Sequence, residues 1–489
     1  MDTPLPDFCP DVARLIRVDC TPFTESCEIQ NDKAVAKGKV VYDLLYETDY
    51  KSRLKYCSFV QEFSQSVPIP RSGATDLTAF CSSKCERIAC QLLSPRRLVI
   101  KATLAADFDL EGDLALTAVA VQEDGEAFFR KKVIGFEGKT DFSRETFPFG
   151  ERFPLNQNEK SIGEILFGSV TLEEPQISLS PGRAEIRSTA LMQILCEEEN
   201  NEGQYYTSVR SLPLSFDLQK EEIADFKRVS VVLEPMDPIF TPELDQYGEN
   251  RVIKADFSVR ATLKISEPKA YTLAEDLFEK GFDSLPVTGN AILPTIFSQQ
   301  EKSFVTEAKL PEMTPAPESI LISSVKEKSL RAEPAEGGVR IHGEFILNLL
   351  TRTPEGIYSF DHPVSYEGFF DCELPPNQFD VLAEIRPAEV IATRHSDGSV
   401  TAKIISTASL TLTTQREESF ISELSSRTPR EAEADEGALI YRFPQKGEDL
   451  WCIAKSYRVS PEGIILANPD KFDESGNLLD SGAPILIKT

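Results

Sequence analysis

Residues Lys33 to Glu47 read KAVAKGKVVYDLLYE, and the fold is best interpreted outward from this stretch. Small and apolar residues alternate with polar ones at its start, which is typical of a strand with one buried face. A second alternating stretch, Phe59–Ile69, follows it, and Ser94–Phe108 supplies a further β-rich run. This order predicts an antiparallel sheet structure in the first hundred residues.

The same order of three stretches recurs twice further along the chain. The counterparts are Ala184–Cys196, Val209–Leu218 and Arg251–Ile265, and then Gly338–Leu350, Ser365–Leu374 and Ser399–Leu412. Similar spacing in all three copies predicts a tandem duplication. Prolines and glycine-containing turns separate the runs, which favours sandwich-like packing of antiparallel sheets. We therefore predict a mostly β protein with three tandem antiparallel β-sandwich-like domains, at residues 1–145, 146–285 and 286–424, the second being the most divergent.

The C-terminal segment, residues 438–489, follows a different pattern. Leu439–Phe443 alternates like a short strand, and Pro484–Ile487 reads as a closing strand. Between them, Asp449 is a candidate N-cap for a helix with one apolar stripe. The stripe consists of Leu450, Ile453, Ala454 and Tyr457. Ser460-Pro461 is a start signal for a second helix, so the segment predicts a small βααβ domain.

Two further segments carry local predictions. Residues 425–437 are polar and acidic without an apolar run, which predicts a flexible linker, with a single charged helical turn as the alternative. Tyr271–Gly281 predicts a helix outside the C-terminal domain, because Thr272 and Glu275 form a capping-box pattern and Gly281 is a helix terminator.

Composition restricts the classes of function. The 489 residues include 79 acidic and 52 basic side chains, for a formal net charge of −27. This charge opposes binding to nucleic acid or anionic lipid. The first residues have no basic start and no apolar core, so no signal peptide is expected. No run approaches the roughly 18 apolar residues of a membrane-spanning helix, and a cytoplasmic protein is expected.

No convincing catalytic or metal centre is found in the sequence. Cys81, Cys85 and Cys90 are spaced more widely than zinc ligands usually are, and reduced, partly buried thiols are the simpler interpretation. The three histidines, His342, His362 and His395, share no metal-ligand spacing and accompany no nucleophile motif. We expect no metal, no cofactor and no enzymatic activity.

The run GKVVYDLLY at 38–46 and its counterparts near 187–195 and 343–350 resemble the SPOCS domain of spore-envelope proteins. The C-terminal segment resembles a LysM domain, a βααβ module that binds glycans or proteins. Three SPOCS-like copies followed by one LysM-like domain resemble spore coat morphogenetic proteins of the SipL and SpoVID type. The resemblance covers nearly the whole chain.

The LysM resemblance implies a ligand groove between the strand–helix turn and the loop after the second helix. Carried onto this sequence, it assigns partner or ligand binding to Gly447, Glu448, Asp449, Leu450, Ile465, Asn468, Pro469 and Asp470. Leu450 and Ile465 are alternatively core residues, and the turn residues alternatively serve capping. The turn reads Gly-Glu-Asp and the final strand ends Ile-Lys, where LysM domains have Gly-Asp-Thr and Ile-Pro. Trp451, the only tryptophan, is interpreted as a packing residue, with sugar stacking as the alternative.

The resemblance implies a non-catalytic scaffold of the spore coat, located in the mother cell at the forespore surface. Its LysM domain is expected to recruit a protein partner such as the morphogenetic ATPase of the coat basement layer, along with other coat proteins. Binding of peptidoglycan or cortex glycan containing N-acetylglucosamine is the alternative. A hydrolase or transferase hidden in the β domains is a third hypothesis. The sequence leaves open the oligomeric state and which β surfaces are adhesive.

Overall fold

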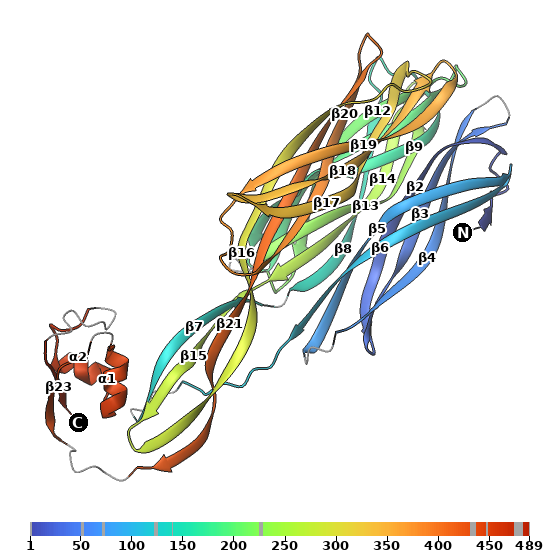
Figure 1. Cartoon of the computed structure of the whole chain (residues 1–489). Helices are drawn as coiled ribbons and strands as arrows, with labels where there is room; N and C mark the ends of the chain where they lie inside the picture. Colours follow the sequence, from blue (N-terminus) through green and yellow to red (C-terminus); the bar gives the residue numbers. More distant parts are fainter. Residues whose placement is uncertain are drawn as a thin grey trace. The chain divides into compact units, whose positions relative to one another are not determined.

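The computed structural model describes residues 2–49, 53–70, 74–121, 126–138, 140–223, 228–430, 437–445, 448–473 and 483–488. Antiparallel strands dominate these residues, which confirms the prediction of a mostly β protein (Figure 1). The chain forms two compact units. The first comprises residues 1–113, 138–267 and 296–414, and the second comprises residues 114–137, 268–295 and 415–489.

The first part of the chain forms two three-stranded sheets. One has the order β2 (Val12–Gln30), β3 (Lys33–Thr48), β4 (Leu54–Pro68), and the other has the order β1 (Asp2–Pro4), β6 (Arg97–Asp113), β5 (Thr75–Ser94). Leu44 and Tyr46 from β3 share one buried core with Leu98 and Ile100 from β6. The sheets therefore bury a common apolar layer between them.

The middle of the first unit is built in a similar way. Its sheets are formed by β9 (Ile162–Leu172), β10 (Gln176–Ser180), β11 (Arg183–Glu198) and β12 (Tyr205–Gln219), and by β13 (Arg228–Leu244), β14 (Asn250–Ser266) and β8 (Asp141–Pro154). Ile186 and Ile194 of β11 share a core with Ile253 and Val259 of β14. Alternate residues of both central strands point into this core, as the period-two pattern requires.

The third pair of sheets follows the same scheme. One sheet has the order β17 (Ser319–Ala335), β18 (Gly338–Thr353), β19 (Gly356–Asp371), and the other has the order β16 (Phe282–Lys309), β21 (Val400–Pro429), β20 (Phe379–Arg394). Phe345 and Leu347 pack in one core with Ile404 and Leu410. The long strands β16 and β21 continue into the second unit.

The stretches that recur in the sequence occupy matching places in these sheets. The first stretches of the three copies form β3, β11 and β18, in that order. The last β-rich runs form β6, β14 and the first part of β21. Each of these strands has a hydrogen-bonded neighbour on both sides. Central strands buried on their core face explain why the apolar content of the chain is concentrated there.

The predicted domain limits fall inside strands. The limits at 145/146, 285/286 and 424/425 lie within β8, β16 and β21 respectively. Residues 425–429 of the expected linker belong to β21, while residues 431–436 lie outside the described residues. The division into three domains stays a prediction.

Two glycines permit close approach between strands. A Cβ on Gly38 of β3 would lie 2.0 Å from the backbone oxygen of Phe23, and one on Gly343 of β18 would lie 1.9 Å from that of Ser329. The neighbouring strands β2 and β17 change register near these points. Glycine is therefore required beside both bulges, where a side chain would collide with backbone.

A bulge also explains the cysteine spacing on β5. The register of β5 shifts between Cys85 and Arg87, so one extra residue is inserted after Cys85. Cys81 is fully buried, and Cys85 and Cys90 pack against the core between the first two sheets. All ten cysteines of the chain are free thiols. The C-x3-C-x4-C spacing thus arises from side chains on one face of a bulged strand.

The second unit contains β7 (Ala127–Glu137) paired with β15 (Pro268–Glu279), the outer parts of β16 and β21, and the C-terminal segment. The predicted helix at residues 271–281 is wrong, because residues 268–279 form β15. A bulge between Ala274 and Asp276 interrupts the alternation, so Ala274, Leu277 and Phe278 are all buried. Their spacing imitates the i, i+3, i+4 pattern of a helix.

Candidate functional site

The C-terminal segment has the order strand, helix, helix, strand. Its elements are β22 (Leu439–Arg442), α1 (Leu450–Tyr457), α2 (Pro461–Ala467) and β23 (Ile485–Lys488), and the two strands pair antiparallel. Ile453, Ala454, Ile464, Ile485 and Ile487 form its buried core. We refer to these residues, 437–488, as the C-terminal module.

Both helices begin at the residues that the sequence indicates. The Asp449 carboxylate accepts a hydrogen bond from the Cys452 backbone N–H at 2.8 Å, and the Ser460 hydroxyl accepts one from Gly463 at 3.2 Å. Pro461 occupies the first turn of α2, where its missing N–H is not needed. The predicted caps are thus confirmed.

One wall of the predicted groove is held by internal contacts. The Glu448 carboxylate accepts hydrogen bonds from the Arg442 guanidinium at 2.7 Å and the Gln445 N–H at 2.8 Å, and these lower the pKa of Glu448. Burial alone would raise the pKa of Asp449, but its hydrogen bonds with Cys452 and the charge of Arg130 lower it. Leu450 is buried in the module core. Gly447 lies outside the described residues.

The other wall is anchored by Asn468. This buried amide donates hydrogen bonds to the carbonyls of Ile464 at 2.8 Å and Leu486 at 2.7 Å, and accepts one from the Leu486 N–H at 2.7 Å. Asn468 therefore ties the end of α2 to β23. Pro469 and Asp470 are exposed. Their assignment to ligand binding, like that of Asn468, stays a prediction.

The predicted apolar anchors occupy one cluster. Leu450 belongs to the buried core of the module, and Ile465 is half-buried against it. Their contacts match the core alternative that the sequence leaves open. Two of the eight predicted binding residues thus meet through packing, whereas Glu448, Asp449 and Asn468 are engaged mainly in capping and backbone contacts.

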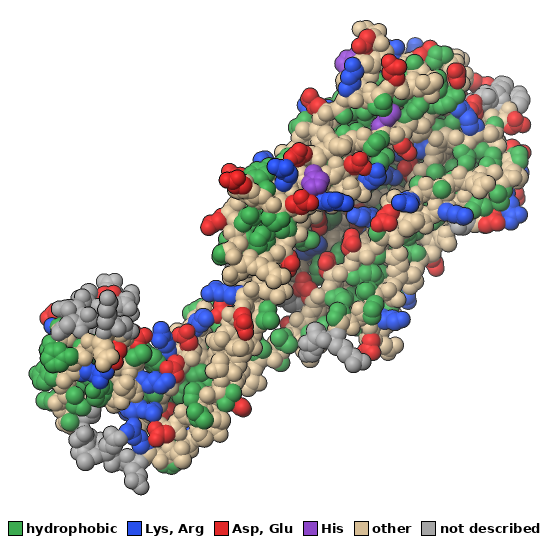
Figure 2. Space-filling view, viewed as in Figure 1, with side chains coloured by type: hydrophobic (Ala, Val, Ile, Leu, Met, Phe, Trp, Pro, Cys, Tyr) green, Lys and Arg blue, Asp and Glu red, His purple; other side chains and the backbone are tan. Residues whose placement is uncertain are grey.

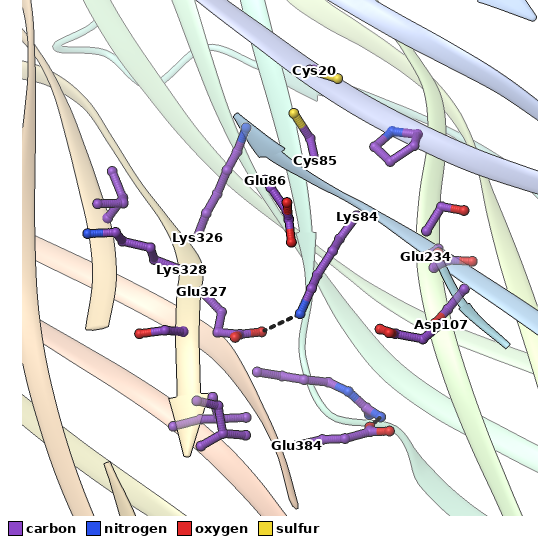
Figure 3. A pocket seen from close by; sticks show the side chains of 18 of the residues that line it. Cys20, Lys84, Cys85, Glu86, Asp107, Glu234, Lys326, Glu327, Lys328 and Glu384 are labelled. Carbon is purple, nitrogen blue, oxygen red and sulfur yellow. Dashed lines mark hydrogen bonds and ion pairs between the residues drawn. The ribbon is translucent and has the colours of Figure 1, made fainter. Parts of the chain in front are cut away.

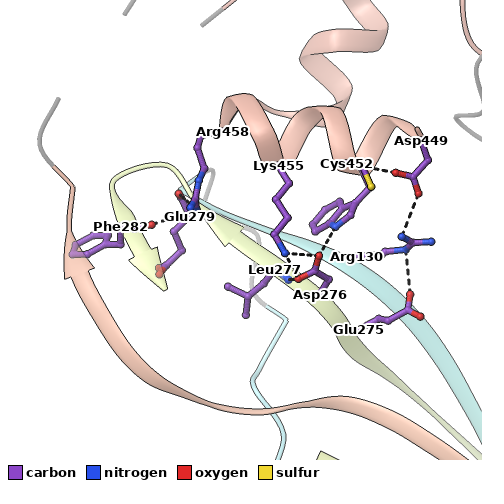
Figure 4. A network of polar contacts seen from close by, with 11 residues as sticks. Arg130, Glu275, Asp276, Leu277, Glu279, Phe282, Asp449, Cys452, Lys455 and Arg458 are labelled. Atoms are coloured by element: carbon purple, nitrogen blue, oxygen red, sulfur yellow. Dashed lines mark hydrogen bonds and ion pairs between the residues drawn. The ribbon is translucent and has the colours of Figure 1, made fainter. Parts of the chain in front are cut away.

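Helix α1 docks on strand β15, which the sequence does not reveal. The Trp451 indole N–H donates to the Asp276 carboxylate at 2.8 Å, and the Lys455 ammonium binds both oxygens of the same carboxylate at 2.6 and 2.7 Å (Figure 4). The Trp451 ring lies 5.2 Å from the ring of Phe278, which is 1% exposed. The packing interpretation of Trp451 matches these contacts.

Two arginines extend this contact. Arg458, at the end of α1, donates to the backbone oxygens of Glu279 at 3.1 Å and Phe282 at 3.4 Å (Figure 4). Arg130 of β7 lies between the carboxylates of Glu275 at 3.1 Å and Asp449 at 3.2 Å. The N-cap of α1 therefore also connects the helix to the β7–β15 pair.

Two large apolar side chains of β22, and that of Phe443 directly after the strand, are exposed on the side away from the module core. Leu439, Tyr441 and Phe443 are 66%, 69% and 66% exposed, whereas Ile440 between them packs against the core. Leu466 on α2 is 81% exposed. Hydrophobic side chains are visible on the surface of the module in Figure 2. We call Leu439, Tyr441 and Phe443 the β22 row. The alternation of Leu439–Phe443 in the sequence was sufficient to place these three side chains on one face, but not to show that this face is exposed.

No group of three or more His, Cys, Asp or Glu side chains in the described ranges could hold a metal ion. Within the same ranges, no helix combines the length and apolar character needed to cross a membrane.

Comparison with known proteins indicates a class related to sporulation and the spore coat. A family model described as "SipL, SPOCS domain" matches residues 11–93, which span β2, β3, β4 and nearly all of β5. The match supports similarity to the SipL-like family in this part of the chain. No curated protein and no solved structure matches the chain.

Proposed function

We propose that this protein is a non-catalytic assembly scaffold of the spore coat, and that its C-terminal module is a LysM domain that recruits a protein partner. The partner we favour is the morphogenetic ATPase of the coat basement layer, met on the mother-cell side of the forespore surface. The observation that carries the proposal is the SPOCS match at residues 11–93. The recurrence of its sheet pattern in two further parts of the chain supports a SPOCS-built body.

The strand–helix–helix–strand order of the module supports the LysM assignment. We assign the partner contact to the β22 row, together with the exposed Pro469 and Asp470 from the predicted groove. Large apolar side chains exposed side by side mark interaction surfaces more often than scattered ones do. Aromatic side chains such as Tyr441 are also typical anchors in protein interfaces.

The state of the thiols supports a non-catalytic role. A nucleophilic cysteine needs a lowered pKa. Here burial raises the pKa of Cys27 to about 11 and the pKa values of Cys57 and Cys196 to about 12. Burial likewise lowers the pKa of His362 against the weaker effect of Asp361. These groups are therefore suited to packing more than to acid–base or nucleophilic work.

Glycan binding is the second candidate, because exposed aromatic rings are also sugar-stacking surfaces. Tyr441 and Phe443 are the described residues of the module that fit this use. Peptidoglycan of the cortex, with its N-acetylglucosamine units, would then be the ligand.

The test uses the full chain against two probes, the purified coat ATPase and purified peptidoglycan. The variant Leu439→Ser with Tyr441→Ser removes two thirds of the β22 row. Leu244→Ser with Tyr247→Ser is the matched control, since those side chains are 65% and 80% exposed in the first unit. Trp451 fluorescence checks that the module remains folded.

We expect the ATPase to be captured by the wild-type chain and by the control but not by the β22 variant. The glycan alternative would be established if the wild-type chain sediments with peptidoglycan, the β22 variant does not, and the ATPase is not captured. Capture of neither probe by the wild-type chain would refute both.

A further inference from the structure

The first unit contains a large cavity, open to the surface, that the proposed function does not use. Its volume is about 1560 Å3, and it is lined by residues of β2, β5, β6, β8, β13, β14, β17, β18, β19 and β20. Figure 3 shows residues of these strands converging on it, and the space-filling view shows the surface of the first unit hollowed and flanked by charged side chains (Figure 2). Small-molecule sites typically occupy roughly 300–1,000 Å3, so the space suits a larger ligand.

Strand edges, in addition to strand faces, border this cavity. Its lining includes the consecutive residues 80–89 of β5, 326–332 of β17 and 381–386 of β20. Successive side chains of a strand point to opposite faces. A strand whose consecutive residues all reach the cavity therefore presents its edge there.

These edges have no ladder partner within the described ranges. β5, β17 and β20 each stand at the end of a three-stranded sheet, after β6, β18 and β21 respectively. Half of the backbone N–H and C=O groups of an end strand point away from its neighbour and are open to a further strand. The Cys81 carbonyl of β5 already accepts a hydrogen bond from Arg144, so residues 82–89 form the open edge, which is about 26 Å long at about 3.3 Å per residue.

Side-chain contacts cross the space between β2 or β5 and β17. Lys84 reaches Glu327 at 3.9 Å (Figure 3). Lys326 reaches Asp19 at 2.8 Å. The Lys84 and Lys326 side chains are both 55% exposed. Their carboxylate partners are less exposed, Glu327 at 22% and Asp19 at 17%, so the cations are the solvent-facing half of each pair. A segment that supplies its own charges could replace such bridges.

The charge of the lining is opposite to that of the chain. Eleven Lys and Arg side chains and eight Asp and Glu side chains line the cavity, although the whole chain carries −27. Several of the cations, Arg87, Lys101, Arg144, Lys264 and Arg331, form no ion pair with a carboxylate within the described ranges.

Two arginines form part of the floor. Arg260 is 5% exposed and is paired with Glu234 at 2.8 Å. Arg144 donates to the backbone oxygens of Thr24 at 3.1 Å and Cys81 at 2.8 Å, and its Nε is buried without a hydrogen-bond partner. An unneutralised guanidinium in such a site is stabilised by an anionic ligand group.

We propose that this cavity binds an extended, acidic polypeptide segment of a partner protein, which adds as a strand to the free edge of β5. Backbone hydrogen bonds to the edge would give affinity, and the unpaired cations of the lining would select acidic side chains. The site lies in the SPOCS-matched and adjoining sheets, and it is independent of partner binding by the C-terminal module.

The experiment measures fluorescence anisotropy of a fluorescein-labelled peptide with the full chain. The probe is a ten-residue peptide of alternating Glu and Val, compared with a Lys and Val peptide of the same length. A third peptide repeats the Glu and Val sequence with N-methyl groups on alternate backbone amides. The variant Arg87→Glu with Arg331→Glu changes exposed positions on β5 and β17. Lys33→Glu with Lys37→Glu on β3, outside the cavity, is the matched charge control.

The Glu and Val peptide is expected to bind, and the cavity variant to weaken it by at least about tenfold, while the control changes affinity less than about twofold. The N-methyl groups remove backbone N–H donors from the edge of the peptide that pairs with β5, so they are expected to weaken binding by a similar factor. Three results would each overturn the proposal: no binding of the Glu and Val peptide, equal loss in the cavity variant and the control, or equal affinity of the N-methylated peptide. Tighter binding of the Lys and Val peptide would reverse the assigned charge preference and would also refute it.

Discussion

Replacing Asn468 with alanine is expected to destabilise the C-terminal module severely. The substitution removes two donated hydrogen bonds and one accepted hydrogen bond, all at 2.7 to 2.8 Å, from a side chain that is 7% exposed. Each such bond contributes about 0.5–1.5 kcal/mol net, so the loss is about 3 kcal/mol. A core of this size rarely supplies more than about 3–5 kcal/mol in total. The variant should therefore be close to its unfolding threshold before any denaturant is added.

The assay relies on Trp451, which is the only tryptophan in the chain and lies in α1. Its fluorescence in a urea titration reports the module within the full-length protein. Asp470→Ala is the control, because this neighbouring side chain is exposed, and its transition should move by less than about 0.5 kcal/mol. If Asn468→Ala unfolds with the same midpoint as the control, Asn468 does not join α2 to β23 as described.

Three further predictions concern other parts of the chain. Gly343→Ala should destabilise the first unit by about 2 kcal/mol or more, because the new Cβ would lie 1.9 Å from a backbone oxygen. Gly281→Ala, with open space around it, should not destabilise the protein, and thermal unfolding of both variants tests the difference. The pKa of the Cys452 thiol is raised by its hydrogen bond with the Asp449 carboxylate and, to a smaller extent, by burial. Asp449→Asn should therefore speed the alkylation of Cys452 at pH 8, measured by peptide mapping, and an unchanged rate would contradict the contact. Burial alone would raise the pKa of Asp276, but its hydrogen bonds with Lys455 and Trp451 lower it below the ordinary value of 3.8. The stability that ionised Asp276 gives the module is therefore present above pH 3.8 and is lost as the pH falls through the lowered pKa. Asp276→Asn should flatten the acid-induced loss of module stability, followed by the fluorescence of Trp451.

Local signals were the most readable from the sequence. The caps Asp449 and Ser460 and the stripe containing Leu450 and Ile453 located both helices, since capping and stripe patterns depend on residues a few positions apart. The alternating runs likewise located the central strands of the sheets. These features are determined by short-range geometry.

Contacts between distant segments could not be predicted in the same way. The bulge in β15 depends on its pairing with the distant strand β7, so the local pattern of Thr272, Glu275 and Gly281 wrongly predicted a helix there. The docking of Trp451 on Asp276 joins residues 175 positions apart, and no periodic pattern encodes such a pair. The cavity requires strands from widely separated parts of the chain. The hydrogen bonds between Asn468 and Leu486 of β23 were likewise not predicted, because these two residues become neighbours only after folding; the assignment of Asn468 to ligand binding, which came from the LysM resemblance, stays a prediction.

The most direct test of the scaffold proposal is the equilibrium affinity of the coat ATPase for the full-length chain, measured with and without Leu439→Ser and Tyr441→Ser. Partner recruitment through the C-terminal module predicts a loss of affinity of about tenfold or more in that variant, as expected when interface anchors are removed, with no change for Leu244→Ser and Tyr247→Ser. Equal affinity in all three proteins would contradict the assignment of this surface. Absence of any binding to the wild-type chain would contradict recruitment of the ATPase altogether.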